Sequence, residues 1–138
     1  MRILFKDDDP LTARTLERQL RKLGHATERI HDVAALLDGQ TELEPDIIIT
    51  DIFMPDIEGL EFIRLLKRSP LRDVPVIAMS GGGTYMGGIP NVEGSFVSRA
   101  ATDFGAVRFL SKPIRLQDLA DAIAACPARQ SRQEQPRA

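Results

Sequence analysis

The chain has 138 residues, of which 43% are hydrophobic and 28% are charged, and its formal net charge is −2 at pH 7. This composition is typical of one globular domain with a hydrophobic core, and it excludes disordered and fibrous chains. The weakly acidic balance also lacks the basic face that direct nucleic-acid binding requires.

The single cysteine, Cys126, cannot form a disulfide within the chain, and a lone thiol is typical of a reducing compartment. No apolar run reaches the ~18 residues that a membrane helix needs. The short apolar stretch that precedes Asp7 does not resemble a signal peptide. We therefore expect a cytoplasmic protein without membrane contact.

Short apolar runs alternate with helical patterns along the chain, which predicts a parallel α/β sheet. Residues 2–6 form the first predicted strand. Asp9 and Pro10 then supply an N-cap and a proline at the first helical position, and Gly24 ends the helix. The apolar residues of this helix recur at helical spacing, at Ala13, Leu16, Leu20 and Leu23.

The next elements include the clearest strand of the sequence. Residues 26–30 predict a weaker strand nearer a sheet edge, and residues 32–39 predict a short helix. Three consecutive isoleucines in residues 47–50 suit a strand that is buried on both faces. Residues 58–68 predict a third helix, with Leu60, Ile63 and Leu66 facing inward.

The second half of the chain repeats the strand–helix pattern twice. The pattern first predicts a strand over 76–79, a glycine-rich loop over 81–94 and a helix over 95–104 that ends at Gly105. It then predicts a strand over 107–110 and a helix over 115–125. The apolar face of the last helix comprises Leu116, Leu119, Ala120 and Ile123. Residues 1–126 are expected to form one domain, and residues 127–138 a polar, disordered tail.

Polar residues stand where four of the predicted strands end. These residues are Asp7, Asp8 and Asp9 after the first strand, Asp51 after the third, Ser80 after the fourth, and Ser111, Lys112 and Pro113 after the fifth. Because ligands bind at the carboxyl ends of the strands in a doubly wound sheet, we expect these side chains to converge on one crevice.

The converging side chains favour phosphoryl chemistry. Several carboxylates stay ionised together only when a cation compensates them, and oxygen ligands with open positions suit Mg²⁺. Lys112 adds a positive charge and Ser80 adds a hydroxyl donor. A carboxylate such as Asp51 can act as a covalent nucleophile toward phosphorus, with the cations neutralising the phosphoryl oxygens.

Four segments resemble the receiver domain of two-component response regulators over about residues 1–125. They are ILFKDDDP at the first strand, IIITDIFMPDIEG around Asp51, VIAMSG at the fourth strand and FLSKPI at the fifth. All four occur in order and each lies at a predicted strand end. The resemblance implies an α/β fold of the stand-alone receiver type: a flavodoxin-like (βα)5 unit whose five-stranded, parallel, doubly wound sheet has the strand order 2-1-3-4-5.

The resemblance also implies a role for individual residues. Asp51 matches the phosphoacceptor, Lys112 the lysine that pairs with the phosphoryl group, and Ser80 the hydroxyl that follows it. Phe109 matches the aromatic residue that changes rotamer with Ser80 on activation. The family also has a cis peptide bond at the position of Lys112-Pro113.

The metal ligands implied by the resemblance are Asp7, Asp8, Asp51 and the backbone carbonyl of Phe53. Asp8 matches a direct ligand, and Asp7 one that acts partly through water. The expected cofactor is Mg²⁺, with Mn²⁺ as a substitute.

The resemblance implies a signalling function rather than a classical enzyme. The chain would take a phosphoryl group from a sensor histidine kinase or a phosphotransfer protein, and would catalyse its own phosphorylation and dephosphorylation. Phosphorylation would switch protein–protein interactions, without direct nucleic-acid or membrane binding. The sequence does not identify the kinase or the downstream target, and it leaves open whether the chain forms a homodimer.

Three departures from the family pattern concern the site. Lys6 stands where the family usually has a small apolar residue, so it needs a partner and should reach toward the acids, with an effect on metal binding or phosphoryl lifetime. The segment between Ser80 and Lys112 is longer than usual. Phe109 lacks the hydroxyl of the commoner tyrosine.

Other interpretations remain open from the residues alone. Acids before a helix can simply complement its dipole, which explains Asp9 better than Asp7. Because of Lys6, the chain could also be a pseudo-receiver, which is a protein-binding module that takes no phosphoryl group. A haloacid-dehalogenase-like phosphatase would need an acid where Phe53 stands. A flavodoxin-like nucleotide binder is disfavoured because the acidic cluster would repel phosphate, and the glycine-rich loop is not a Walker motif.

Overall fold

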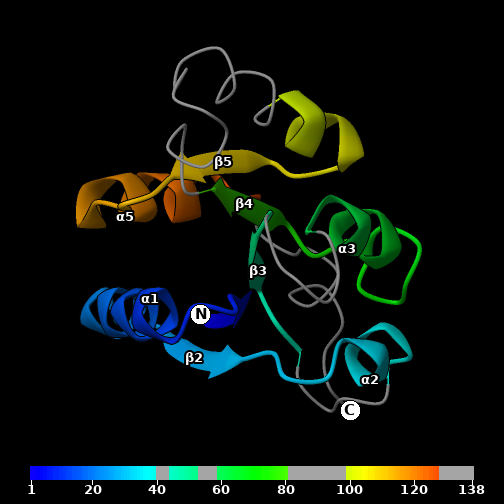
Figure 1. Cartoon of the computed structure of the whole chain (residues 1–138), viewed down its shortest axis with the longest axis horizontal. Helices are drawn as coiled ribbons and strands as arrows, with labels where there is room; N and C mark the ends of the chain where they lie inside the picture. Colours follow the sequence, from blue (N-terminus) through cyan, green and yellow to red (C-terminus); the bar gives the residue numbers. More distant parts are fainter. Residues whose placement is uncertain (40–43, 53–58, 81–98, 128–138) are drawn as a thin grey trace.

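The computed structural model describes residues 1–39, 44–52, 59–80 and 99–127, and it contains a five-stranded parallel sheet (Figure 1). The order of the strands is β2-β1-β3-β4-β5, which confirms the predicted flavodoxin-like topology. The strands are β1 (Arg2–Lys6), β2 (Ala26–Arg29), β3 (Ile47–Asp51), β4 (Val76–Ser80) and β5 (Arg108–Ser111). As predicted, β2 lies at an edge.

Four helices have assigned bounds, namely α1 (Pro10–Lys22), α2 (Val33–Leu37), α3 (Gly59–Leu66) and α5 (Leu116–Ala125), and residues 99–104 are also helical. The Asp9 side chain caps α1 by accepting from the Leu11 backbone N–H, and Pro10 is its first residue. Gly24 and Gly105 have φ angles of 90° and 123°, which glycine adopts without strain, so each ends its helix as predicted.

Several boundaries differ from the sequence prediction by one residue. β3 and β4 extend through Asp51 and Ser80, and β5 covers Arg108–Ser111 rather than 107–110. The cause is pairing with neighbouring strands, because Asp51 lies beside Met79 and Ser80 beside Ser111 in the ladders. The glycine-rich loop over 81–94, residues 95–98 of the predicted fourth helix, Phe53 and the tail beyond Pro127 lie outside the described residues.

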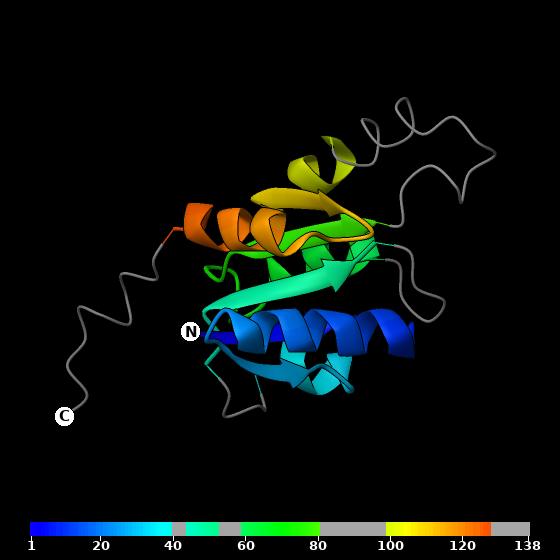
Figure 2. The ribbon, with the colours of Figure 1, turned by 90° about the vertical axis from the view of Figure 1, so that its left-hand side faces the viewer.

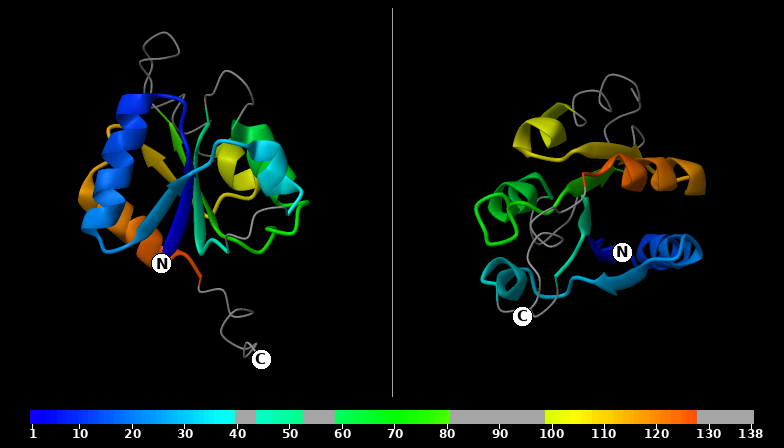
Figure 3. Two further views of the ribbon diagram at one scale, coloured as in Figure 1. Left: turned by 90° about the horizontal axis from the view of Figure 1, so that it is seen from below. Right: turned by 180° about the vertical axis from the view of Figure 1, so that it is seen from behind.

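The helices cover both faces of the sheet, as the two perpendicular views show (Figures 2 and 3). α1 and α5 pack on one face, over a cluster that includes Ile49 and Ile77. α2, α3 and residues 99–104 cover the other face, over a cluster that includes Ile48 and Val76. Neighbouring residues of β3 therefore face opposite sides, and every residue of that strand is buried, as predicted.

The helix faces were predicted correctly in outline. Ile63 and Leu66 of α3 are buried, and so are Leu119 and Ile123 of α5. Four residues of the predicted apolar faces are only partly buried, namely Leu23, Leu60, Leu116 and Ala120. Two buried residues were missed, Phe62 and Ala122. Within the described ranges, the structure contains no helix with the length and apolarity needed to span a bilayer.

Candidate functional site

The predicted site residues meet at one edge of the sheet because the strands are parallel and end together. Asp7 directly follows β1, whose last residue Lys6 lies beside Thr50 of β3. Asp51 ends β3 and Ser80 ends β4. Lys112 follows Ser111 of β5, and its backbone N–H donates to the Ser80 carbonyl at 2.7 Å. Four strand ends thus contribute to one cluster, as the sequence predicted.

Lys112 links two of the carboxylates. Its Nζ donates to Asp7 Oδ2 at 2.9 Å and to Asp51 Oδ2 at 2.7 Å. Burial on its own would lower the pKa of this ammonium, but the hydrogen bonds and charges of Asp51 and Asp7 outweigh burial and raise the pKa above its ordinary value. Lys112 therefore stays charged and faces inward. The peptide bond between Lys112 and Pro113 is cis.

Asp7 is held rigidly from several directions. Its side chain is fully buried, and its Oδ1 accepts from the Asp9 backbone N–H at 2.9 Å while Lys112 occupies Oδ2. The Asp7 backbone carbonyl accepts from the Arg29 guanidinium at 2.6 Å. Sequence reasoning missed Arg29, although its place at the end of a strand beside β1 was a usable signal. These contacts hold a buried carboxyl group in one position at the tip of β1.

Asp8 has a different partner. Lys6 Nζ donates to Asp8 Oδ1 at 2.7 Å, and the two side chains are 8% and 24% exposed. The other oxygen, Asp8 Oδ2, is buried and has no hydrogen-bond partner among the residues that the structure describes. The expectation that Lys6 reaches the acids is therefore confirmed, and one oxygen of Asp8 remains available.

Gly59 packs against the backbone of the candidate phosphoacceptor. A Cβ atom at this position would lie 2.1 Å from the Asp51 carbonyl oxygen and 2.5 Å from Ile52 Cα. The Gly59 N–H donates to the Ile52 carbonyl at 2.7 Å. The start of α3 can therefore approach the end of β3 only without a side chain. Sequence reasoning did not assign Gly59 a role, because a glycine at a helix start carries no signal of what lies opposite.

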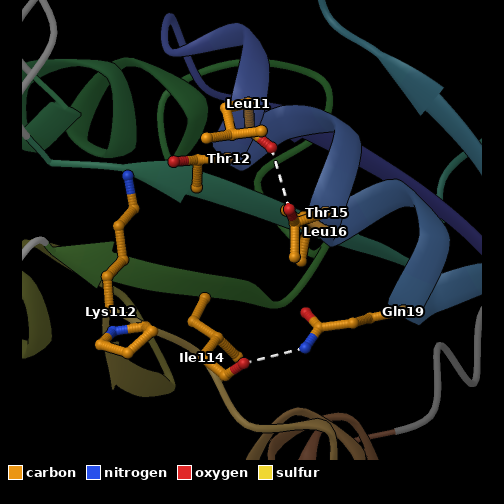
Figure 4. A pocket seen from close by; sticks show the side chains of 8 residues that line it. Leu11, Thr12, Thr15, Leu16, Gln19, Lys112 and Ile114 are labelled. Carbon is orange, nitrogen blue, oxygen red and sulfur yellow. Dashed lines mark hydrogen bonds between the residues drawn. The ribbon is translucent and has the colours of Figure 1, made fainter.

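A groove of about 350 Å³ opens beside Lys112, between α1 and the segment that follows β5 (Figure 4). One wall consists of α1 residues, including Leu11, which is 72% exposed, and Thr15. Lys112 and Ile114 line the other wall. Gln19 joins the two walls, since its Nε2 donates to the Ile114 carbonyl at 2.8 Å. A partly apolar surface therefore borders the charged cluster directly.

Comparison with known proteins identifies the family. The family described as "Response regulator receiver domain" matches residues 3–124. The chain belongs to this receiver-domain family. Receiver domains are signalling modules of two-component systems, and the match covers every candidate site residue from Asp7 to Lys112.

Relatives and solved structures agree with this assignment. The chain is 32% identical over 127 residues to the sensory/regulatory protein RpfC of Xanthomonas campestris, covering 90% of this chain and 16% of that protein. It is 33% identical over 119 residues to the response regulator MprA of Mycobacterium avium, covering 86% and 47%. The chain thus spans less than half the length of both relatives.

Two solved structures share the fold closely. A response regulator receiver protein from Pseudomonas putida superposes with a TM-score of 0.70 at 25% identity, covering 89% of this chain and 94% of that one. A sensor protein from Polaromonas sp. JS666 gives a TM-score of 0.71 at 26% identity, covering 89% and 92%.

The acidic cluster of this receiver domain can be tested for its fit to a divalent cation. Within the parts of the chain that the structure describes, no three acidic, histidine or cysteine side chains form a group ready to hold a metal. The buried and unpartnered Asp8 Oδ2 is nevertheless a hard oxygen donor of the kind that Mg²⁺ prefers. Phe53, whose carbonyl was an expected ligand, lies outside the described residues. The donors that are described fit a cation that completes its coordination with other oxygens.

Phe109 occupies an intermediate position in this receiver domain. It lies in β5 and packs, partly buried, against the hydrophobic cluster under α3 and residues 99–104. Its neighbour Leu110 is buried on the opposite face. Phe109 is therefore neither exposed nor fully buried.

Proposed function

We propose that this receiver domain accepts a phosphoryl group on Asp51 from a phosphohistidine on a sensor histidine kinase or a phosphotransfer protein. The observation that carries the proposal is the contact of Lys112 Nζ with both Asp51 and Asp7. This contact brings the ammonium that follows β5 against the carboxylates at the ends of β3 and β1, which supports a pairing of acceptor and phosphate-binding cation. Family membership supports the same reaction class.

In the proposed transfer, an oxygen of Asp51 forms a bond to phosphorus as the phosphorus–nitrogen bond of the phosphohistidine breaks. The imidazole leaves in its neutral form after taking up a proton from solvent. Lys112 follows the charge from the carboxylates to the new phosphoryl oxygens, because its four-carbon stem is mobile and its ammonium remains charged. The Ser80 hydroxyl donates to another phosphoryl oxygen.

A bound Mg²⁺ would neutralise charge on the phosphoryl group. The groups that would hold it are the side chains of Asp8 and Asp51, the Phe53 carbonyl and, through water, Asp7. Other residues of the chain position these groups. Lys112 and the Asp9 N–H hold the Asp7 carboxyl group in place, and the close approach of Gly59 fixes the backbone of Asp51.

The groove beside Lys112 suits the approach of the phosphoryl donor. Its α1 wall presents the exposed Leu11, and its other wall includes Lys112 itself. A helix of the donor that packs against Leu11 would bring its phosphohistidine next to the acceptor site. The groove therefore offers both apolar contact area and proximity to the reacting carboxylate.

Phosphorylation would act as a switch through β4 and β5. The phosphoryl group adds about −1.5 to −2 charge, and Ser80 and Lys112 move toward it. This movement changes the packing beside Phe109, whose inward rotamer is stabilised by apolar burial. The altered surface would change affinity for a downstream protein.

The proposal is tested by incubating the chain with acetyl phosphate and Mg²⁺ and measuring its intact mass. We expect one added phosphoryl group on the wild type and none on Asp51→Asn. Circular dichroism spectra of both proteins should show that they are folded. Removal of the divalent ion with EDTA should abolish the labelling. Equal labelling of the Asp51→Asn variant, or no labelling of the wild type, would contradict the proposal.

A second candidate function is a pseudo-receiver that binds proteins without taking a phosphoryl group. The ion pair between Lys6 and Asp8 favours it, because the ammonium occupies one oxygen of the acid that a metal would need. The same labelling experiment separates the two candidates, since a pseudo-receiver would stay unlabelled at every Mg²⁺ concentration.

A further inference from the structure

Lys6 is a charged residue in an apolar strand. It ends β1 directly after Phe5, which is fully buried, and Lys6 itself is only 6% exposed. A buried ammonium is costly unless a charged partner compensates it. The described partner is Asp8, two residues further along the chain, at 2.7 Å. The sequence therefore places a cation inside the acidic cluster itself.

Two ammonium groups contact three carboxylates at the site, since Lys112 contacts both Asp7 and Asp51 while Lys6 contacts Asp8. With the Arg29 guanidinium at the Asp7 carbonyl, the positive and negative side chains of the cluster are equal in number. An acidic cluster that lacked Lys6 would keep an uncompensated carboxylate and would attract a divalent cation more strongly.

We propose that Lys6 competes with the divalent cation for Asp8 and thereby sets the metal requirement of the site. This inference rests on the proposed function, and it concerns how tightly the site binds the divalent cation. A cation on Asp8 Oδ2 would lie next to the ammonium on Oδ1, and two positive charges at that separation repel each other strongly in a partly buried site. Lys6 must therefore withdraw from Asp8, or tolerate the repulsion, each time the metal binds.

The structure gives Lys6 a geometry that suits this role. Its Nζ reaches Asp8 within the same segment of chain, so the pair reforms whenever the metal leaves. Asp7 is not the partner of Lys6, because its two oxygens accept from the Asp9 N–H and from Lys112. Lys6 therefore affects metal binding through Asp8, and phosphorylation would depend on the divalent-ion concentration around the protein.

The competition is tested with Mn²⁺ alone, by following the free-ion signal in electron paramagnetic resonance during titration of the whole chain. Lys6→Met removes the charge while keeping most of the side-chain volume. We expect Lys6→Met to bind Mn²⁺ on the order of tenfold more tightly than the wild type. Lys6→Arg, which keeps the charge, should bind no more tightly than the wild type. Lys22→Met serves as the matched control, because Lys22 is an exposed lysine at the end of α1.

A stability measurement gives a second readout that does not depend on metal affinity alone. Lys6→Met leaves the Asp8 carboxylate without its cation, so its unfolding midpoint in EDTA should fall below that of the wild type. Saturating Mn²⁺ should then raise the midpoint of Lys6→Met more than that of the wild type. If Lys6→Met does not fold, Lys6→Gln is measured in the same way.

The outcomes distinguish this inference from the proposed function. Unchanged Mn²⁺ affinity in Lys6→Met, with acetyl phosphate labelling of the wild type, would overturn the competition and leave phosphorylation intact. Tighter binding in Lys6→Met, with no labelling of the wild type, would support the competition and favour the pseudo-receiver. Absence of Mn²⁺ binding in both proteins would overturn the competition.

Discussion

At the scale of single residues, Lys112 is the residue on which the site depends most. Its side chain is 17% exposed, and its two acceptors are the fully buried Asp7 and the nearly buried Asp51. Removing one member of a buried ion pair leaves the other charge without compensation, which costs more than the pair itself contributes. The ammonium is therefore expected to stabilise the fold as well as to bind the phosphoryl group.

We predict that Lys112→Met lowers the free energy of unfolding by about 1–3 kcal/mol at pH 7 in EDTA, because Asp7 and Asp51 are then left close together without a cation. Urea denaturation followed by circular dichroism measures this difference. The exposed control Lys22→Met should stay within about 0.5 kcal/mol of the wild type. An unchanged urea midpoint for Lys112→Met would contradict this prediction, because it would mean that other groups compensate the charges of Asp7 and Asp51.

The sign of the pH dependence follows from the raised pKa of Lys112. A base whose pKa is raised by folding contributes stability that is fully present below its unfolded value, 10.5, and is lost as the pH rises through the higher folded value. The difference between the wild type and Lys112→Met should therefore be constant from about pH 7 to pH 9. It should decrease only above about pH 10.5.

The residues of the site were predictable to the extent that the order of the strands determines their position. Asp51, Ser80 and Lys112 follow apolar strands, so parallel topology alone brings them together. The place of Arg29 at the end of a strand beside β1 indicated that it lies near the site, but its contact with the Asp7 carbonyl depends on the reach and direction of one long side chain. The sequence predicted that Lys6 needs an acidic partner, but only the structure shows that this partner is Asp8 rather than Asp7 or Asp9.

At the scale of elements, the end of β3 and the start of α3 are joined by a very close backbone approach. The sequence predicted the end of β3 and the start of α3 to within one residue, but nothing in it indicated that they touch at Gly59. Strand ends were also the least predictable boundaries, because the last ladder positions of β3 and β4 depend on hydrogen bonds to neighbouring strands rather than on local composition. The candidate acceptor is therefore held by the sheet ladder on one side and by α3 on the other.

We predict that Gly59→Ala destabilises the domain by about 2–3 kcal/mol, because the new Cβ would overlap the backbone at Asp51 and Ile52 and would force β3 and α3 apart. Gly24→Ala is the matched control, since Gly24 has a φ of 90° but nothing within 4 Å of an added Cβ. That variant should lose only about 1 kcal/mol from backbone strain. Urea midpoints of the two variants measure the contrast, and an equal loss in both would mean that α3 moves freely away from β3.

At the scale of the whole molecule, one sheet separates two hydrophobic clusters that share no side chains. Ile63 of α3 belongs to the cluster on one face, and Ile123 of α5 to the cluster on the other. The alternation of apolar runs predicted both layers, and the resemblance supplied the strand order that composition cannot provide. Because β1, β3, β4 and β5 each contribute residues to both clusters, the domain should unfold as one cooperative unit.

Cooperativity can be tested with one mild substitution on each face. Ile63→Val and Ile123→Val should each cost about 0.5–1.5 kcal/mol, because each removes one buried methylene group. The double variant should lose the sum of the two values within about 0.5 kcal/mol, since the side chains lie on opposite faces and share no partners. All three variants should unfold in a single urea transition, seen identically by far-ultraviolet circular dichroism and by methyl resonances in NMR spectra. Two separate transitions would mean that the helical layer of one face melts while the other persists, and that the sheet edge carrying Asp51 and Lys112 is not held rigidly by both layers.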